Sequence, residues 1–260
     1  MYHYSKKDIE ISINKLNLNY GDVVYISGSL LNFGIPSISK IDDLSKLFFN
    51  LIKKKIGKNG TIAVPTHTFN LVNNKKIFNP LTSKCMTGSL SNFIIKKKNS
   101  YRQPHPYASI SAIGPKAKEI CNSKDIDVYG SNCPFKKLVN FNAKFLSLGL
   151  PINENCTQVH LIEKEFNVPY RYSKEFYHKI IFKKKIKRKL FTMFVLKEKH
   201  RNFKRNKNKI IIKNFLKTNI IQTISLGNNQ IYLYDLKKFY KSTKNLFKKN
   251  IYAWSGKEIY

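Results

Sequence analysis

A strand–helix–strand pattern near the N-terminus constrains the fold more than any other feature of this chain. Residues 23–27 (VVYIS) form a continuous apolar and β-branched run, which is typical of a strand covered on both faces. Over residues 41–52 apolar side chains recur every three or four positions, as in an amphipathic helix. Residues 60–65 (GTIAVP) have the composition of a second buried strand. Because such a succession closes a right-handed parallel crossover, the sequence predicts an α/β fold.

The rest of the chain adds one more buried strand and several short helices. Residues 143–150 (AKFLSLGL) form a third apolar run, and lysine-rich strands alternate with short helices from about residue 170 onward. We expect a single domain over residues 1–260, with a mixed, largely parallel sheet flanked by helices. Whether the divergent, lysine-rich second half, residues 173–260, forms a subdomain is left open. Helical patterns cover residues 88–95, 115–124, 133–140 and 155–166.

The chain is strongly basic, with 48 lysine and arginine residues against 15 aspartate and glutamate residues and a formal net charge of +33. Clustered lysine suits nucleic-acid phosphates, anionic lipid or an anionic cofactor equally well. The chain is also rich in Asn, Ile, Tyr and Phe, which AT-rich codons specify together with Lys. No zinc-finger, helix-turn-helix or aromatic RNA-reading pattern accompanies the charge. We therefore predict no dedicated nucleic-acid binding.

The apolar runs and the cysteines give predictions about the cellular compartment and about metal binding. No apolar run approaches the roughly 20 residues of a membrane-spanning helix, and the first residues lack the apolar segment of a secretory signal. We expect a cytoplasmic protein without a membrane span. The cysteines form no CxxC pair and no cluster with zinc spacing, which predicts free, buried thiols and no metal site, with a nucleophilic Cys156 as the alternative. The four are Cys85, Cys121, Cys133 and Cys156.

Two histidines, His105 and His67, occupy positions that make them candidates for a functional site. His105 lies between Pro104 and Pro106, and proline on both sides limits the backbone to extended shapes. His67 follows the second predicted strand, at the edge of the sheet where parallel folds build their sites. A lone histidine is more often structural, so this evidence marks candidates only.

His160 and Glu163 stand three residues apart on a predicted helix and therefore share one face. A carboxylate beside an imidazole orients the ring, fixes its tautomer and raises its basicity, which suits a general base. An ordinary surface ion pair is the alternative. The chain has no GxSxG elbow, Walker loop or GxGxxG fingerprint, which argues against lipase, NTPase and dehydrogenase functions.

Eight short segments then follow one another over about residues 5 to 175, roughly two thirds of the chain. They are GDVVYISGSLLNFG (21–34), KNGTIAVPTHTF (58–69), FNP (78–80), GSLSNF (88–93), RQPHPYASISAIGPKA (102–117), CPFKKL (133–138), KFLSLGLPINENCTQVHLIEKE (144–165) and VPYRY (168–172). In order and spacing this succession resembles the aminoglycoside 3-N-acetyltransferase family. No single segment is highly specific, but eight in sequence are.

The resemblance implies transfer of an acetyl group from acetyl-coenzyme A to an amine, on the α/β fold of that family, without a metal. It implies His160 as the base, Glu163 orienting it or binding the acceptor's ammonium group, and His105 in the same pocket; whether His160 or His105 is the base stays open. The expected partners are coenzyme A and a small-molecule amine, and no oligomeric state follows. The residues expected to bind the cofactor are Ser27, Gly28, Ser29, Leu30, Arg102 and Ser109.

The sequence also departs from the family pattern. Ser27-Gly28-Ser29 stands where the family usually has His-Ser-Ser, and Arg102-Gln103 where it usually has Arg-Ser. Aminoglycosides are polycations, which a chain at +33 matches poorly unless Glu154, Glu163 and Glu165 make the site locally acidic. We therefore expect the acceptor to be an aminoglycoside or another amino sugar, including a nucleotide-linked one, and the sequence does not decide between them. A non-catalytic relative that binds coenzyme A or a polyanion is the alternative.

Overall fold

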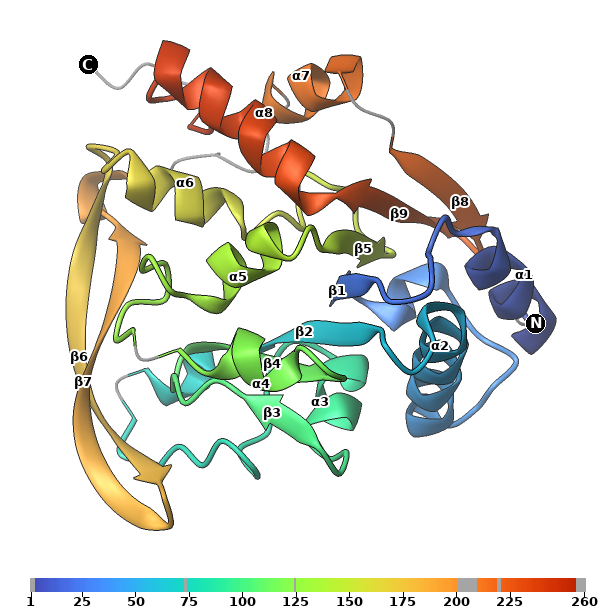
Figure 1. Cartoon of the computed structure of the whole chain (residues 1–260), viewed down its shortest axis with the longest axis horizontal. Coiled ribbons are helices and arrows are strands. Elements are labelled where there is room, and N and C mark those ends of the chain that lie inside the picture. The colour runs from blue at the N-terminus through green and yellow to red at the C-terminus, as the bar shows by residue number, and fades with distance from the viewer. Residues whose placement is uncertain (1–2, 73, 124, 201–209, 219–220, 256–260) are drawn as a thin grey trace.

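A seven-stranded sheet forms the centre of the molecule, with strand order β3-β4-β2-β1-β5-β9-β8 (Figure 1). The computed structural model describes residues 3–72, 74–123, 125–200, 210–218 and 221–255. The strands of the sheet are β1 (Val23–Gly28), β2 (Thr61–His67), β3 (Ser100–Arg102), β4 (Ala108–Ile113), β5 (Lys144–Leu148), β8 (Gln222–Leu226) and β9 (Asn229–Asp235).

The predicted crossover lies in the middle of this sheet. β1 pairs in parallel with β2 on one side and with β5 on the other. Helix α2 (Ile41–Ile56) connects β1 to β2 and ends at Gly57, whose φ of 66° ends the helix in a conformation that favours glycine. The βαβ unit and the third buried strand are therefore confirmed.

The sheet is mixed and flanked by helices, as predicted, but less parallel than predicted. The pairings β2–β4, β3–β4, β5–β9 and β8–β9 are all antiparallel. A buried apolar run has the same composition in either direction, so it indicates burial without indicating strand direction. The two parallel pairings are confined to the centre, where the crossover determines them.

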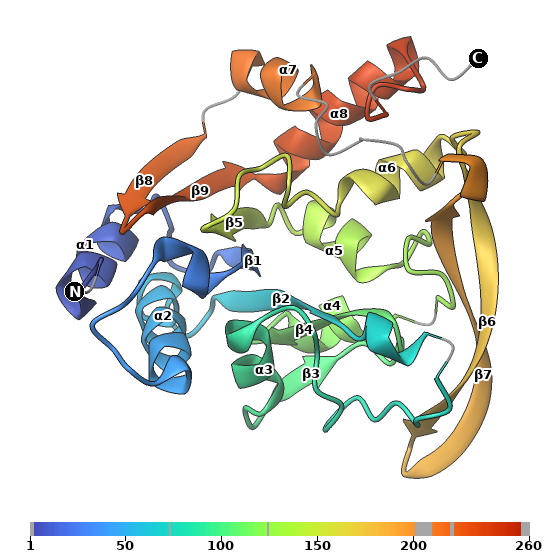
Figure 2. The same ribbon diagram turned by 180° about the vertical axis from the view of Figure 1, so that it is seen from behind.

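Helices cover both faces of the sheet (Figures 1 and 2). Alternate residues of β1 enter different cores, with Val24 and Ile26 on one side and Val23 and Tyr25 on the other. The first core is covered by α1 (Lys6–Lys15), α2 and α3 (Ser89–Ile95), and the second by α4 (Ala117–Cys121), α5 (Pro134–Asn140), α6 (Val159–Glu165), α7 (Ile210–Thr218) and α8 (Leu236–Lys249). No helix in the described ranges is long and apolar enough to cross a membrane.

A long hairpin stands apart from the sheet. Strands β6 (Arg171–Phe182) and β7 (Lys185–Leu196) pair only with each other among the described strands, and the hairpin runs past α6 toward the loop after β2 (Figures 1 and 2). It is docked by a small apolar cluster and by two bridges, Phe78 to Ile180 and Asp127 to Thr192. The lysine-rich second half thus contributes both this hairpin and two strands of the central sheet.

Candidate functional site

The predicted site residues gather at the carboxyl ends of the parallel strands. Because β1, β2 and β5 run in the same direction, the segments that follow them emerge at one edge of the sheet. His67 ends β2, the Ser27–Leu30 segment ends β1, and α6 follows β5 with His160 on its first turn.

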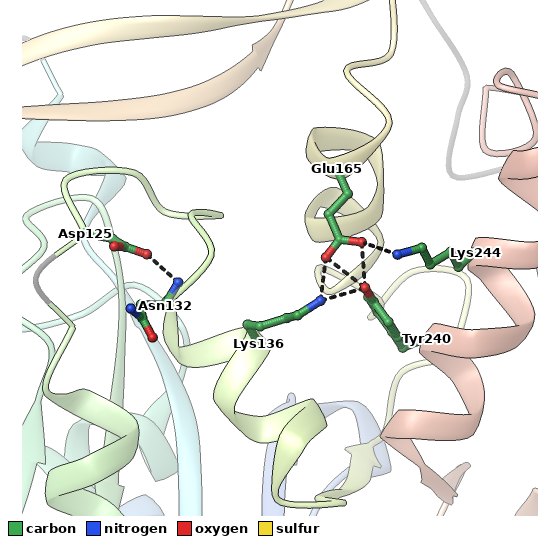
Figure 3. A network of polar contacts seen from close by, with 6 residues as sticks. All are labelled: Asp125, Asn132, Lys136, Glu165, Tyr240 and Lys244. Carbon is green, nitrogen blue, oxygen red and sulfur yellow. Dashed lines mark hydrogen bonds and ion pairs between the residues drawn. The ribbon is translucent and has the colours of Figure 1, made fainter.

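Helix α6 is held in place by a polar network on its outer side. The Glu165 carboxylate lies 2.7 Å from the Lys136 ammonium group of α5 and 3.2 Å from that of Lys244 on α8. The Tyr240 hydroxyl, also on α8, donates to the same carboxylate at 2.5 Å (Figure 3). Three groups from two neighbouring helices therefore fix the position of a helix that has only seven residues.

On the inner side of α6, His160 and Glu163 are in direct contact. The Nδ1 atom of His160 lies 2.5 Å from Oε2 of Glu163, and the Nε atom of Arg171 lies 2.7 Å from the same oxygen. The Glu163 side chain is fully buried, while 21% of the His160 side chain is exposed. The pair therefore consists of a buried carboxylate and a partly accessible imidazole. It is not an ordinary surface ion pair, in which both side chains would be exposed.

The charge state of Glu163 follows from its neighbours. Burial alone would raise the pKa of Glu163, but the positive charges of His160 and Arg171 and the hydrogen bonds from His160 and Tyr170 outweigh it and hold the pKa below its ordinary value. The carboxylate is thus ionised and fixes His160 through Nδ1. The Tyr129 ring contacts the His160 ring edge-on, with centroids 5.8 Å apart. Oriented in this way, the imidazole can take a proton through Nε2.

His105 is buried deeper and has different surroundings. It is 1% exposed, its Nδ1 accepts the backbone N–H groups of Tyr107 and Ala108, and its ring contacts that of Phe191. Burial lowers the pKa of His105 to about 4, against smaller opposing contributions from the Ile126 carbonyl and Asp127. An imidazole with this pKa is a weak proton acceptor near pH 7, and which of His160 and His105 is the base stays a prediction.

His67 is buried, and its pKa depends on the charges of both His105 and His160. It is 7% exposed, and burial, followed by the charges of His105, Arg102 and His160, lowers the pKa of His67 to about 4. His67 is therefore within electrostatic range of both imidazoles, which come from segments far apart in the sequence. The sequence pattern marked His67 only as the end of a strand.

Four of the six predicted cofactor residues line one pocket. Ser27, Gly28, Ser29 and Leu30 face Gly88 and its neighbours at the start of α3 across this space. No charged side chain lines the pocket in the part of the chain that the structure describes. Gly28 has a φ of 135°, and a Cβ there would lie 2.0 Å from the Leu148 carbonyl oxygen. The absence of a side chain at Gly28 therefore lets the backbones of β1 and β5 approach each other closely at this strand end.

Arg102 and Ser109, the other two, lie in a buried network beside β2. Arg102 donates from Nε to Ser109 Oγ at 3.0 Å, from Nη2 to the Thr66 carbonyl at 2.7 Å and from Nη1 to the Ser83 carbonyl at 2.5 Å. Ser109 Oγ also donates to the Thr66 carbonyl at 2.8 Å. These bonds hold the loop after β2, and a contact of either residue with coenzyme A stays a prediction.

With the fold and the geometry in view, the comparisons with known proteins identify the family. The sequence profile described as aminoglycoside 3-N-acetyltransferase matches residues 31–248. This chain belongs to the aminoglycoside 3-N-acetyltransferase family. The resemblance inferred from the eight segments is thus confirmed.

Curated relatives of the family match with low identity. Aminoglycoside N(3)-acetyltransferase III from Salmonella sp and from Enterobacter cloacae are each 24% identical over 184 residues, which cover 64% of this chain and 62% of the relative. The chain therefore spans less than two thirds of the length of these curated relatives.

Solved structures of aminoglycoside acetyltransferases share the fold over nearly the whole chain. AAC(3)-Xa superposes with a TM-score of 0.78 at 18% identity, covering 94% of this chain and 92% of that one. Sisomicin-bound AAC-VIa gives 0.79 at 17% identity, covering 95% and 98%. The binary complex of AAC-IIIb with CoASH gives 0.75 at 18% identity, covering 94% and 96%. The α/β fold of the family is confirmed for this chain.

The surroundings of the cysteines bear on the alternative of a nucleophilic Cys156. All four are free and buried, as predicted. Burial raises the pKa of the Cys121 and Cys133 thiols to about 12 and that of Cys156 further still. A thiol that stays protonated near pH 7 is a poor nucleophile, so the geometry argues against the Cys156 alternative.

The contacts of Glu163 include residues that sequence reasoning missed. Arg171 and Tyr170 belong to the last of the eight segments, VPYRY, but their spacing from Glu163 gave no sign of contact. Tyr129 lies in a segment to which no motif pointed. The one signal in the sequence for the contact of Arg171 with Glu163 was that this arginine lies inside a segment that the family shares.

Proposed function

We propose that the chain is an acyltransferase that moves the acetyl group of acetyl-coenzyme A to an amino group of an aminoglycoside or another amino sugar. The observation that carries this proposal is the partly accessible His160 imidazole, held through Nδ1 by the buried carboxylate of Glu163. Family membership and the CoASH complex of AAC-IIIb support coenzyme A as the carrier.

The proposed chemistry is direct transfer. The neutral amine of the acceptor attacks the thioester carbonyl, and His160 takes one N–H proton as the new C–N bond forms. The tetrahedral intermediate then expels the coenzyme A thiolate, which receives a proton and leaves as the free thiol. Glu163 stabilises the imidazolium that forms during the step, since an ionised carboxylate at 2.5 Å favours the protonated ring. No covalent enzyme intermediate is needed.

The pocket at the end of β1 is the proposed place for coenzyme A. Its lining of glycine and serine backbone offers N–H groups at the end of a strand and the start of a helix, which suit phosphate oxygens. Acetyl-coenzyme A is therefore proposed as the acyl donor. The cytoplasm is the proposed compartment, because four free thiols are typical of a reducing environment.

The acceptor is the least constrained part of the proposal. Two of the three carboxylates that could attract a polycation are already engaged, Glu163 by Arg171 and Glu165 by Lys136 and Lys244, whereas Glu154 is exposed. This arrangement favours an amino sugar that carries negative charge, such as a nucleotide-linked one, over a tetracationic drug. Sisomicin in AAC-VIa shows that an aminoglycoside occupies the site of that relative.

Two measurements test the proposal. Acetyl-coenzyme A should raise the melting temperature, and thiol release should then be followed with a panel of aminoglycosides and amino sugars. His160→Ala should lower turnover on the order of 10²–10⁴-fold while keeping the acetyl-coenzyme A shift. A shift without thiol release for any acceptor would favour a non-catalytic coenzyme A-binding relative, and near-full activity of His160→Ala would remove this residue from the mechanism.

A further inference from the structure

A second pocket, lined by none of the residues around the end of β1, lies under the β6–β7 hairpin. Its volume is about 400 Å³. Its walls come from Gln103 and His105 after β3, from Asp125 after α4, and from the hairpin residues Phe182 and Phe191. His105 is the one lining residue that the family resemblance also connects with acetyl transfer, and the direct-transfer steps proposed above use no other residue of this lining.

Ammonium groups converge on one wall of this pocket. The Nζ atoms of Lys189, Lys187 and Lys183 lie 4.1, 5.9 and 6.0 Å from the centre of the Phe182 ring, and Lys183 and Lys189 line the pocket. None of the three forms an ion pair with a carboxylate among the described residues. An aromatic face compensates a cation only weakly, so three like charges around one ring favour an anion between them.

The other side of the pocket offers a hydrogen-bond donor and little opposing charge. Gln103 is 2% exposed, and its side-chain Nε2 has no hydrogen-bond partner among the residues that the structure describes. A buried N–H group without a partner is unfavourable, and an oxygen of a ligand would satisfy it. Among the described lining residues Asp125 is the one carboxylate, and its Oδ2 atom accepts the Asn132 backbone N–H at 2.8 Å (Figure 3).

We propose that this pocket binds the phosphate group of a small phosphomonoester, independently of acetyl transfer. A phosphomonoester carries between one and two negative charges near pH 7, which matches two or three ammonium groups. The volume exceeds that of a bare phosphate and falls in the range of pockets for small organic ligands. The aromatic walls formed by Phe182 and Phe191 suit the organic body. A polymer would instead lie on the exposed outer lysines of the hairpin.

Calorimetric titration of the full chain tests the proposal, with glucose 6-phosphate as the probe and glucose and inorganic phosphate as controls. Glucose 6-phosphate should bind more tightly than inorganic phosphate, and glucose should not bind. Lys183→Gln and Lys189→Gln should each weaken glucose 6-phosphate binding by about tenfold, since a charge-assisted contact is lost. Lys185→Gln removes the same charge from an exposed hairpin position outside the pocket and should change the affinity less than twofold.

Three outcomes would overturn the inference. Equal losses in Lys185→Gln and Lys189→Gln would mean that the diffuse charge of the chain binds the anion. Displacement of glucose 6-phosphate by saturating coenzyme A would assign these lysines to the coenzyme. Absence of heat at millimolar glucose 6-phosphate would leave the pocket without this ligand. None of these results bears on thiol release, so the proposed acetyl transfer can stand or fall separately.

Discussion

Replacing Glu163 with Gln should lower the stability of the fold and also lower the rate of the proposed acetyl transfer. The substitution keeps the shape of the side chain but removes a charge that is fully buried between His160 and Arg171. The Arg171 side chain is itself only 5% exposed, so its guanidinium group would remain inside the protein without its counter-ion. Removing one partner of a buried ion pair costs about 3–5 kcal/mol. For a chain of this size that corresponds to a fall in Tm of roughly 6–20 °C.

Thermal unfolding followed by circular dichroism provides the measurement, and the same helix provides the control. Glu165→Gln removes an equal charge from a carboxylate that is 23% exposed and should cost about 1 kcal/mol or less. The double variant Glu163→Gln/Arg171→Met should lose less than the sum of its single changes, with a coupling of about 0.5–3 kcal/mol. Equal shifts for the two glutamates, or strictly additive losses in the double variant, would refute the account of a buried pair.

The pH dependence of this effect has a definite sign. The pKa of Glu163 is lower in the folded state than its ordinary value of 4.5, so the unfolded chain binds more protons as the pH falls below that value. The stability contributed by the carboxylate is therefore complete above the ordinary pKa and is lost as the pH falls through the folded pKa. The Tm difference between the wild type and Glu163→Gln should be largest near pH 7 and should shrink in acid. A constant difference down to strongly acidic pH would contradict the assignment.

Three further predictions concern other parts of the site. Gly28→Ala places a Cβ 2.0 Å from a backbone oxygen and should abolish the acetyl-coenzyme A shift in Tm. Gly21→Ala, at a φ of 85° with open space around the new Cβ in the described part of the chain, should cost only about 1–2 kcal/mol of backbone strain. Burial lowers the pKa of both His67 and His105 to about 4, below the ordinary 6.5, so the NMR signals of these two rings should not titrate between pH 5 and 8. Because the unfolded chain binds more protons than the folded one between pH 6.5 and 4, the stability that these histidines contribute should fall over that range as the pH drops. Arg102→Met should cost about 2–4 kcal/mol in urea unfolding, and Arg102→Lys should recover little of it because lysine cannot reproduce the three-way donation.

The sequence predicted the parts of the fold that local pattern determines. The buried runs of β1, β2 and β5 and the period of α2 depend on neighbouring residues, so each was found close to its observed position. The short strands β3 and β4 were not predicted, and the antiparallel directions of β4 and β9 depend on how distant segments meet, which a run of apolar residues does not encode.

The same division holds within the site. The three-residue spacing of His160 and Glu163 was enough to predict their contact, because helix geometry places such residues on one face. The contact of Arg171 with Glu163 depends on where β6 begins relative to α6. The electrostatic interaction between His67 and His105 depends on the pairing of β2 with β4. These are products of tertiary packing, and no local signal in the sequence carries them.

Helix α6 shows why the lysine-rich second half matters to the proposed chemistry. Seven residues are too few for a helix to be stable alone, so its position depends on what surrounds it. Its two carboxylates have opposite tasks: Glu163 points inward and orients the imidazole, while Glu165 points outward and ties the helix to Lys244 on α8. Arg171, at the start of β6, supports the inward one. Two of the groups that hold α6, Tyr240 and Lys244, therefore come from the lysine-rich second half, whereas Arg171 belongs to the last of the eight segments, so both parts of the chain are needed to position His160.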